Sequence, residues 1–531
     1  MYPENIKRSL EAVRAARSEN ISCEPARMTQ EKKEYLLLEH HPDHAKAGFS
    51  HLSVGASKGE RVPTELCELL QSRPRIDARS IDLSHPRHDV DVLVIGGGGA
   101  GCVAAIEASN AGVRALIATK SFMGDANTIM AEGGIQAADK DDDSPLIHFI
   151  DTLGGGNFIS NRELVSKLVH DAPEAIRWLI GLGVEFDRDA HGNLVVNHGG
   201  GTSRKRVHSA KDLTGLEIMR TLRDEVKDRK IPILEYTAAI ELILDESGRA
   251  AGAVLMDMNA QEVFAVRAGA VVLATGGSGR MHYGGFNTSN HYGATADGLV
   301  LGYRAGAKLI HAHSLQYHPT GAAFPPQLAG SLVTEKARSL GARLINVDGE
   351  VFVHPLETRD VTAASIIREC KERGKGVSTP IGAAVWLDIP MIDEIHGAGT
   401  IKNQLTGIFK MFERQGIDVR KEPILVYPTL HYQNGGLEIT PDAMTSIKGL
   451  FAAGEVTGGI HGTNRLMGNS LLDVVVFGRI AGQNAATEAK GASLGSPTLS
   501  HVSAFEAELA QSGIHIETTA PLLFPNYDKN A

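Results

Sequence analysis

Residues 90–120 read VDVLVIGGGGAGCVAAIEASNAGVRALIATK, and this stretch decides the fold. Five β-favouring residues lead into the glycine turn Gly96-x-Gly98-x-x-Gly101, an alanine-rich helix follows, and a second apolar strand covers 113–118. The glycines let the backbone approach a pyrophosphate, which the partial positive charge of the helix N-terminus stabilises. Glycine also closes ordinary turns, but the strand–turn–helix–strand order favours a site for an ADP-containing dinucleotide.

One part of this dinucleotide fingerprint is missing. A carboxylate at the end of the second strand normally binds the adenosine ribose, about twenty residues after the turn. Here that strand ends in Thr119-Lys120-Ser121, with no acid. NAD is therefore less favoured than the turn alone suggests, and other residues must select the cofactor.

The composition is that of a globular protein with more than one domain. The chain has 531 residues, 42% of them hydrophobic and 22% charged, and this length exceeds what one core usually holds. A net charge of −10 argues against a nucleic-acid binder, which would show a basic stripe. No apolar run approaches a membrane span and the N-terminus has no signal-peptide core, so we expect a cytoplasmic protein.

The cysteines indicate no redox centre within the chain. They show no CxxC, no haem-attachment motif and no iron–sulfur spacing, so we expect isolated reduced thiols and no metal site. The four cysteines are Cys23, Cys67, Cys102 and Cys370.

Two groups of histidines stand outside the glycine pattern. His40, His41 and His44 lie in a charged, proline-punctuated stretch without clear metal-ligand geometry, so we predict surface histidines. His311 and His313 could share one strand face, and we assign them no role.

The order of strands and helices predicts a Rossmann-like α/β fold with an inserted α+β capping domain. Strands and helices alternate after residue 89, and two further apolar strands, 270–274 and 450–453, run into glycine turns, as in a doubly wound sheet. Polar helical stretches and short strands then suggest an insertion. The expected parts are an N-terminal extension of unknown role at 1–88, a discontinuous dinucleotide-binding domain at 89–320 and 428–490, a capping domain at 321–427 and a C-terminal tail at 491–531.

A helix near the end of the chain is a candidate second ligand contact. Asn469 and Ser470 precede the apolar run LLDVVVFGRIAGQNAATEA and are predicted to cap it. Its N-terminus could stabilise negative charge on a reduced flavin. A capped core helix is the alternative, and the sequence leaves both open.

Ten short motifs occur in order along the chain: GGGGAG, AEGG, ATGGSGR, ADG, QYHPTG, TE, TRD, LHY, AAGE and HGTNRLMGNSLLD. In this order they closely resemble the flavoprotein subunit family of succinate dehydrogenase and fumarate reductase, which includes L-aspartate oxidase. The resemblance covers about 89–490. It implies that the cofactor is FAD and that the Rossmann-like domain is an FAD-binding domain.

By resemblance, the FAD site falls on these motifs. Asp297 and Glu455 match acids that contact FAD and are expected to replace the missing acid. Relatives with covalent FAD attach it through a histidine in an H-T-x-x-A-E-G-G run, where this chain has Asn127-Thr128, so we expect non-covalent FAD. The expected FAD-binding residues are Gly96, Gly98, Gly101, Thr119, Lys120, Asn127, Thr128, Glu132, Gly133, Gly134, Thr275, Gly276, Asp297, Glu455, Asn469, Ser470 and Leu471.

The substrate residues also follow from the resemblance. A four-carbon dicarboxylate needs two separate anion pockets, and charge-assisted hydrogen bonds suit them. By resemblance, His318 with Thr334 holds one carboxylate, and His431 with Arg465 holds the other.

The resemblance also implies the proton donor. Arg359 matches the family's acid/base arginine, which gives a proton to one alkene carbon while FAD delivers hydride to the other. Arginine is a poor acid, with a pKa above about 12, so a neighbouring carboxylate must re-protonate it. Glu335, with Arg338 one helical turn later, matches that relay.

These assignments imply an FAD-dependent oxidoreductase that interconverts fumarate and succinate. Its electrons would pass to or from a separate subunit, iron–sulfur or similar, or a soluble carrier. The lack of a covalent link leans toward reduction or toward an oxidase-like use. L-aspartate oxidase is the first alternative. The family's R-E-G-G-H-S run is HGGGTS here, with Gly199 in place of the glutamate, so a substrate ammonium would lose a hydrogen bond worth about 1.5–3 kcal/mol. An enoate reductase and an electron-conduit flavin subunit of a larger complex are further alternatives.

Overall fold

The computed structural model describes residues 2–525 and 527. The stretch that opened the sequence forms β4 (His88–Ile95), α4 (Gly99–Asn110) and β5 (Ala115–Ala118), which is the predicted strand–turn–helix–strand unit. β4 and β5 pair in parallel. The helix therefore connects two neighbouring parallel strands, as in Rossmann-like folds.

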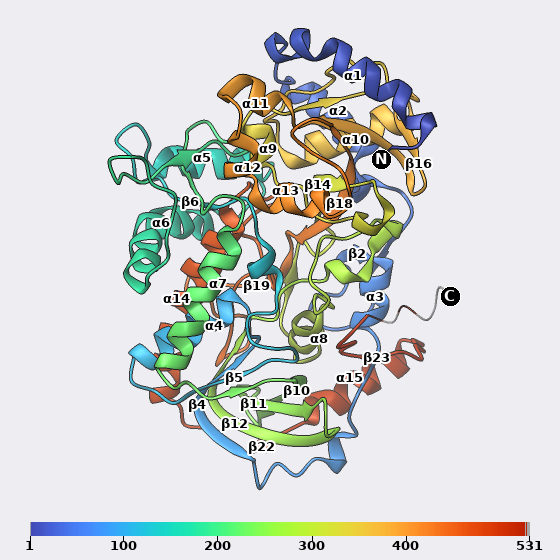
Figure 1. The fold of residues 1–531 in the computed structure, drawn as a ribbon. Helices are drawn as coiled ribbons and strands as arrows, with labels where there is room; N and C mark the ends of the chain where they lie inside the picture. Colours follow the sequence, from blue (N-terminus) through green and yellow to red (C-terminus); the bar gives the residue numbers. More distant parts are fainter. Residues whose placement is uncertain (1, 526, 528–531) are drawn as a thin grey trace.

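These strands belong to a large mixed sheet in the lower part of Figure 1. Its other strands are β9 (Ile233–Leu234), β10 (Thr237–Asp245), β11 (Ala250–Asp257), β12 (Glu262–Leu273), β20 (Leu450–Ala452) and β22 (Pro497–Thr498). The order is β22–β10–β11–β12–β4–β5–β9, with β20 also paired to β12. β12, β4, β5, β9 and β20 are parallel, whereas β10 and β11 form an antiparallel meander beside them.

The parallel strands end level with one another. Ile95 of β4 and Ala452 of β20 both lie opposite Leu273 of β12, and a glycine turn follows each strand. The strands predicted at 270–274 and 450–453 are confirmed, although the first is only the end of the longer β12. Three glycine turns thus meet at the carboxyl edge of the sheet, where such sheets bind ligands.

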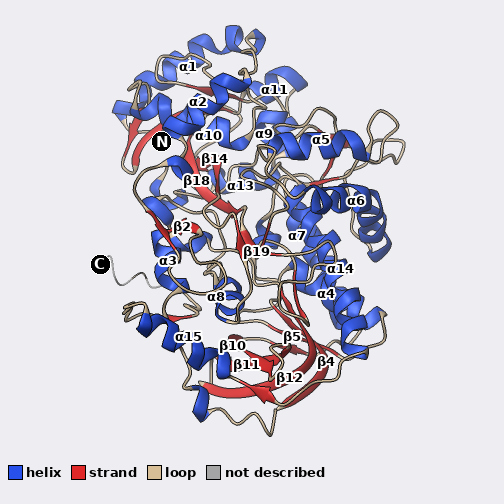
Figure 2. Cartoon of the chain, turned by 180° about the vertical axis from the view of Figure 1, so that it is seen from behind, coloured by secondary structure: helices blue, strands red, loops and turns tan. Residues whose placement is uncertain are grey.

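Helices cover both faces of the sheet (Figures 1 and 2). The helices that lie on the sheet, or pack on those that do, are α6 (Arg162–Leu182), α7 (Thr214–Asp228), α8 (Asp297–Arg304), α14 (Asn469–Lys490) and α15 (Ser500–Gln511). α5 (Pro145–Gly155) packs on α6, away from the sheet. α4 packs against α7 and α14, while α8 and α15 pack on the side of β10. The approach of α14 to α4 requires glycine, because a Cβ at Gly482 would lie 2.3 Å from the carbonyl oxygen of Ala104.

A second sheet, in the upper part of Figure 1, has a hydrophobic core of its own around the fully buried Trp386. Its strands are β14 (Leu315–Ala322), β15 (Arg343–Ile345), β16 (Val377–Thr379), β17 (Gly382–Asp388) and β18 (Ile424–Gln433). Around it lie α9 (Lys336–Ser339), α10 (Arg359–Lys371), α11 (Met391–His396), α12 (Thr400–Gln404) and α13 (Thr406–Glu413). The predicted bounds of the capping domain, 321–427, stay a proposal. β14 runs across the first of these bounds and β18 across the second.

The N-terminal segment contacts both cores. α1 (Glu4–Ser22) contributes Ile6 and Val13 to the core of the second sheet. α2 (Gln30–His40) packs along α10. α3 (Thr64–Leu70) joins the core of the large sheet.

The prediction of surface histidines is wrong for His41. Its side chain is 6% exposed, and burial lowers its pKa to about 3. The local sequence is polar, and the burial comes from tertiary packing that a local pattern does not report: the His41 ring lies edge-on against Tyr317 of β14, with centroids 5.7 Å apart. A cavity of about 60 Å³ at this junction is lined by His41, His44, His313, Asp43 and Asp360, among others. In the described part of the chain, no group of three or more His, Cys, Asp or Glu side chains is arranged to hold a metal ion.

Two short strands near the end of the described chain pair with earlier strands. β22 extends the large sheet beside β10, and β23 (Thr519–Ala520) pairs with β3 (Arg73–Pro74) of the N-terminal segment. Within residues 2–525 and 527, no helix combines the length and the hydropathy that crossing a membrane requires.

Candidate functional site

A cavity of about 630 Å³ lies at the carboxyl edge of the parallel strands and extends to the second sheet. All the predicted FAD-binding residues line it except Gly101 and Asn469. Of the predicted catalytic residues, Arg338 also lies outside the lining. The predicted substrate and catalytic residues that do line it are His318, Thr334, Glu335, Arg359, His431 and Arg465.

The glycine turn after β4 leaves no room for side chains. A Cβ at Gly96, whose φ is +122°, would lie 2.1 Å from the carbonyl oxygen of Ala274 in the neighbouring turn. Gly101 instead packs the helix onto the turn, since a Cβ there would lie 1.9 Å from the Gly96 carbonyl oxygen. The start of α4 therefore faces the cavity as bare backbone, which fits a pyrophosphate group.

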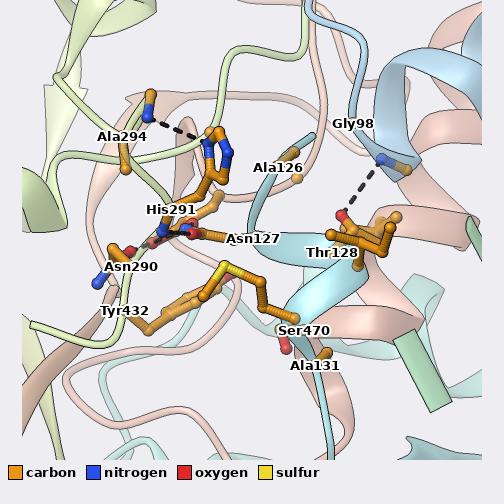
Figure 3. A pocket seen from close by; sticks show the side chains of 18 of the residues that line it. Gly98, Ala126, Asn127, Thr128, Ala131, Asn290, His291, Ala294, Tyr432 and Ser470 are labelled. Atoms are coloured by element: carbon orange, nitrogen blue, oxygen red, sulfur yellow. Dashed lines mark hydrogen bonds between the residues drawn. The ribbon is translucent and has the colours of Figure 1, made fainter. Parts of the chain in front are cut away.

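The side chain of Asn127 is held by hydrogen bonds to three neighbours (Figure 3). Its Nδ2 donates to Asn290 Oδ1 at 2.7 Å and to Glu455 Oε2 at 2.9 Å, and its Oδ1 accepts from the His291 amide at 2.6 Å. Next to it, the Thr128 hydroxyl accepts from the Gly99 amide at 3.2 Å. These bonds join the turn after β4 to the loop that carries Asn290.

The acids expected to replace the missing ribose ligand both line the cavity. Asp297 forms an ion pair with Lys120 at 2.5 Å, so the lysine at the end of the second strand holds an acid from another element. The Glu455 carboxylate accepts from Asn127 and from the Gln433 amide at 3.1 Å. Burial raises the pKa of Glu455.

The start of α14 differs from its prediction. The helix begins at Asn469, but Gly468 is its N-cap, in a left-handed conformation with φ +89°, and no side chain caps it. Asn469 points away from the cavity, where its side chain meets His148 Nε2 at 3.0 Å and Thr152 Oγ1 at 3.1 Å. Ser470 and Leu471 line the cavity, so the uncapped amides of this 22-residue helix begin at its wall.

The opposite end of the cavity gathers side chains that are far apart in sequence. His318 lies on β14, His431 on β18 and Arg465 in the loop before α14. The two imidazole rings pack edge to face with centroids 5.1 Å apart. Ser289 Oγ lies 2.7 Å from His431 Nδ1, and the Arg465 guanidinium lies over the Tyr432 ring at 4.6 Å.

Arg359 is the first residue of α10, and it is paired with a buried carboxylate. Its Nε donates to Glu335 Oε2 at 2.8 Å and its Nη1 donates to Gln316 Oε1 at 3.0 Å. Arg338 lies behind Glu335, with Nη2 at 3.2 Å from the same Oε2, and donates to the Pro355 carbonyl. The side chains of Glu335 and Arg338 are fully buried.

Comparisons with known proteins agree with these features. The family described as "FAD binding domain" matches residues 91–471. A polypeptide of the fumarate reductase (CoM/CoB) from Methanothermobacter marburgensis is 40% identical, over 76% of this chain and 74% of that protein. An L-aspartate oxidase from Streptomyces coelicolor is 36% identical, over 76% and 69%. A variant of E. coli quinol fumarate reductase FrdA matches with a TM-score of 0.72 at 32% identity, over 80% and 74% of the chains.

This chain belongs to the fumarate reductase and succinate dehydrogenase flavoprotein family. The flavoprotein is an FAD-dependent oxidoreductase, and FAD is its cofactor. The two sequence relatives are named after different substrates, fumarate for one and L-aspartate for the other. The glycine turn, the start of α14 and the Asn127 side of the cavity are features that FAD binding explains.

The charges around the flavoprotein's cavity favour an anionic substrate. Burial, followed by the nearby Arg359 cation, lowers the pKa of His318 and of His431 well below the usual value, so both imidazoles are neutral. Burial raises the pKa of Glu335, but the cations of Arg359 and Arg338 lower it by a larger amount. The pKa of Glu335 is therefore below its usual value. Burial, then repulsion from Arg359, lowers the pKa of Arg465 to about 9.

Glu132 is a buried acid at the wall of the flavoprotein's cavity. Its pKa is raised well above the usual value, first by burial and then by Asp212. Its Oε2 has no hydrogen-bond partner among the described residues. In its neutral form this carboxyl is a hydrogen-bond donor available to a ligand.

Sequence reasoning missed Gln316 and Ser289. Gln316 belongs to the quoted QYHPTG motif, two residues before His318, and period-2 alternation in a strand predicts that both lie on one face of β14. That signal was present in the sequence. Ser289 lies in a loop, and no periodicity relates it to His431.

Proposed function

We propose that this flavoprotein reduces fumarate to succinate, with Arg359 as the proton donor. The observation that carries the proposal is the Arg359–Glu335 pair at 2.8 Å, placed at the same end of the cavity as His318, His431 and Arg465. His318, His431 and Arg465 provide neutral and cationic hydrogen-bond donors for the two carboxylates of a small diacid. Arg359, which is not one of these carboxylate-binding residues, provides the proton.

The chain's residues have distinct tasks in this proposal. FAD, once bound and reduced by the electron-transfer partner, would supply the hydride for one alkene carbon. His318 with Thr334 holds one carboxylate and His431 with Arg465 holds the other, which orients the alkene against Arg359.

Arg359 releases a guanidinium proton to the second alkene carbon. Glu335 Oε2, bonded to Arg359 Nε, takes up a proton that comes from solvent through the relay and passes it to Arg359, so that both groups regain their starting charge. The lowered pKa of Glu335 means that it passes this proton on rather than retaining it. Arg338 stabilises the Glu335 carboxylate from behind.

The FAD is expected to be held without a covalent bond. Asn127 has no nucleophilic nitrogen, and its amide is already engaged by three neighbours. Acid precipitation of the purified protein should therefore leave the yellow flavin in the supernatant, as absorbance near 450 nm would measure. Flavin that stays with the pellet would contradict the non-covalent assignment.

The pH dependence of fumarate reduction should report Arg465. Its pKa is about 9, so the guanidinium is a cation below that pH and neutral above it. Because kcat/KM reports the free enzyme, it should fall about tenfold per pH unit above pH 9 through loss of the carboxylate partner. A flat kcat/KM between pH 8 and 10, with flavin still bound, would remove this role.

The assay that tests the function uses a reduced viologen dye and compares fumarate with larger enoates, and an oxidised dye with succinate. We expect turnover with fumarate. Gly199 offers no carboxylate to a substrate ammonium, and Gly200 donates its amide to Glu335, so the turn there presents backbone only. Aspartate-dependent peroxide release without fumarate reduction would instead support L-aspartate oxidase.

We also propose an electron-transfer partner. The relative from Methanothermobacter marburgensis is described as one subunit of its fumarate reductase. Three of the four cysteines, Cys67, Cys102 and Cys370, are buried, and their spacing fits no iron–sulfur motif. Co-purification of an iron–sulfur subunit from native extract would support this part of the proposal.

A further inference from the structure

Residues 24–40 of the N-terminal segment lie along the helix that carries Arg359. α2 packs against α10 (Figures 1 and 2). Lys33 near its start pairs with Glu357, and His40 at its end pairs with Glu372 at 2.9 Å. The two helices therefore run in the same direction, and the start of α2 lies at the start of α10.

The contacts concentrate on the five residues before Arg359. Glu357 is fully buried, and its carboxylate accepts from the Met28 amide at 2.8 Å and pairs with Lys33 Nζ at 2.7 Å. Arg27 Nη1 donates to the Leu356 carbonyl at 2.9 Å, and Glu24 Oε1 lies 3.1 Å from His354 Nε2. Four residues of the segment thus hold 354–357, and Arg359 follows two positions later.

The first turns of α10 are held by apolar contact as well. Leu36 is 1% exposed and forms a small separate core with Val361 and Ala364. Val361 and Ala364 therefore lie on the face of α10 that meets α2. A shift of this helix along its axis would break the ion pair at its start and this contact together.

Residues on either side of the 24–40 segment are bonded to the second sheet. On one side Arg17 makes two hydrogen bonds to Asp388, at 2.8 and 2.9 Å, at the end of β17. On the other side the Asp43 carboxylate accepts from the Leu315 amide at 2.9 Å, at the first residue of β14. β14 carries Gln316, which accepts the second bond from Arg359.

We propose that Lys33 and Glu357 are positioning residues that hold the start of α10 so that Arg359 meets Glu335, Gln316 and the substrate at once. The proposal rests on the proposed function of Arg359 as proton donor. The physical reason is that a proton donor must be placed within a fraction of an ångström, and a misplacement of about 1 Å can lower a rate about 100-fold. Residues 24–40 lie outside the family-matched range 91–471.

The decisive variant is Lys33→Met, which keeps the side-chain length and removes the charge. It leaves Glu357 as an unpaired buried carboxylate, and such a site relaxes toward water. Lys32→Met is the matched control, because Lys32 is its exposed neighbour on α2 and makes no side-chain bond among the described residues. Lys33→Arg is the rescue, since it restores the cation.

Two readouts are measured on the flavin-loaded full-length proteins. Hydrogen exchange of backbone amides, followed by mass spectrometry of peptides covering 354–364, reports how firmly the start of α10 is held, without any substrate. Dye-linked fumarate reduction gives kcat per bound flavin and KM. For Lys33→Met we expect faster exchange in 354–364 and a kcat about tenfold lower, with KM unchanged because the carboxylate-binding residues are not on this loop.

Lys33→Arg should restore both values, and Lys32→Met should match the unmodified protein. Unchanged exchange in Lys33→Met, or faster exchange with an unchanged kcat per flavin, would overturn the positioning role. If the unmodified protein does not reduce fumarate while Lys33→Met still loosens 354–364, the proposed function fails and the hold on α10 stands.

A double-mutant cycle gives a second, independent test. Glu357→Gln keeps an acceptor for the Met28 amide but removes the charge, and Lys33→Met/Glu357→Gln removes both charges. If the two residues act as a pair, the double variant should lose no more kcat than Lys33→Met alone. Losses that multiply would contradict a joint action.

Discussion

Arg359→Ala is expected to lower kcat for dye-linked fumarate reduction by about 10²–10⁴-fold, the range that a general acid contributes. The guanidinium is the cavity-lining group bonded both to Glu335, at 2.8 Å, and to Gln316, at 3.0 Å. Alanine at the first position of α10 supports the helix, so the loss should be chemical rather than structural. The measurement is kcat per bound flavin, with flavin content taken from absorbance.

The matched control is Arg373→Ala. Arg373 lies just beyond the same helix, pairs with Glu369 at 3.1 Å and is 46% exposed, so its loss should change kcat by no more than about twofold. Fumarate turnover retained in Arg359→Ala with FAD bound would remove the acid role. It would leave the family assignment untouched.

Arg465→Met should lower kcat/KM for fumarate by roughly 10²–10³-fold, mainly through KM. Arg465 is buried, lies over Tyr432 and lines the cavity beside His431. Methionine fills much of the same volume without charge, so one substrate carboxylate would lie unpaired in a buried site. The measurement compares fumarate with its monomethyl ester in Arg465→Met and in the unmodified protein.

The monomethyl ester of fumarate carries a single carboxylate, so it tests whether Arg465 binds the other one. The unmodified protein should prefer fumarate strongly, and Arg465→Met should narrow that preference, because the ester has no charge to lose at one end. An equal loss for both substrates would assign Arg465 to FAD or to the fold. Flavin content of the variant distinguishes those two cases.

The parts of the fold that could be predicted from the sequence depend on local order. The glycine turn, the helix after it and the strand ends at Leu273 and Ala452 follow from patterns within about thirty residues. The order of the motifs led us to expect His318, Arg359 and Arg465 in one site, and all three line one cavity. Their roles there stay proposals.

The parts that sequence reasoning missed depend on contacts between distant segments. His41 is buried against Tyr317 of β14, while its own neighbours in sequence are polar. Asn469 is a favourable capping residue type, yet Gly468 takes the cap and Asn469 bonds to His148 and Thr152 instead. The antiparallel β10 and β11 were not predicted as separate elements, since apolar runs of their length do not reveal their partners.

The position of α1 also constrains the order of events during synthesis. Tyr2 donates its hydroxyl to the Pro423 carbonyl, a contact that spans 421 residues. At about 5–20 residues per second, the ribosome needs roughly 20–80 seconds to make the chain between Tyr2 and Pro423. Until then, Ile6 and Val13 lack part of the core that surrounds them in the folded protein. α1 is thus made long before the residues that it packs against, and it can complete the second core only after they have been made.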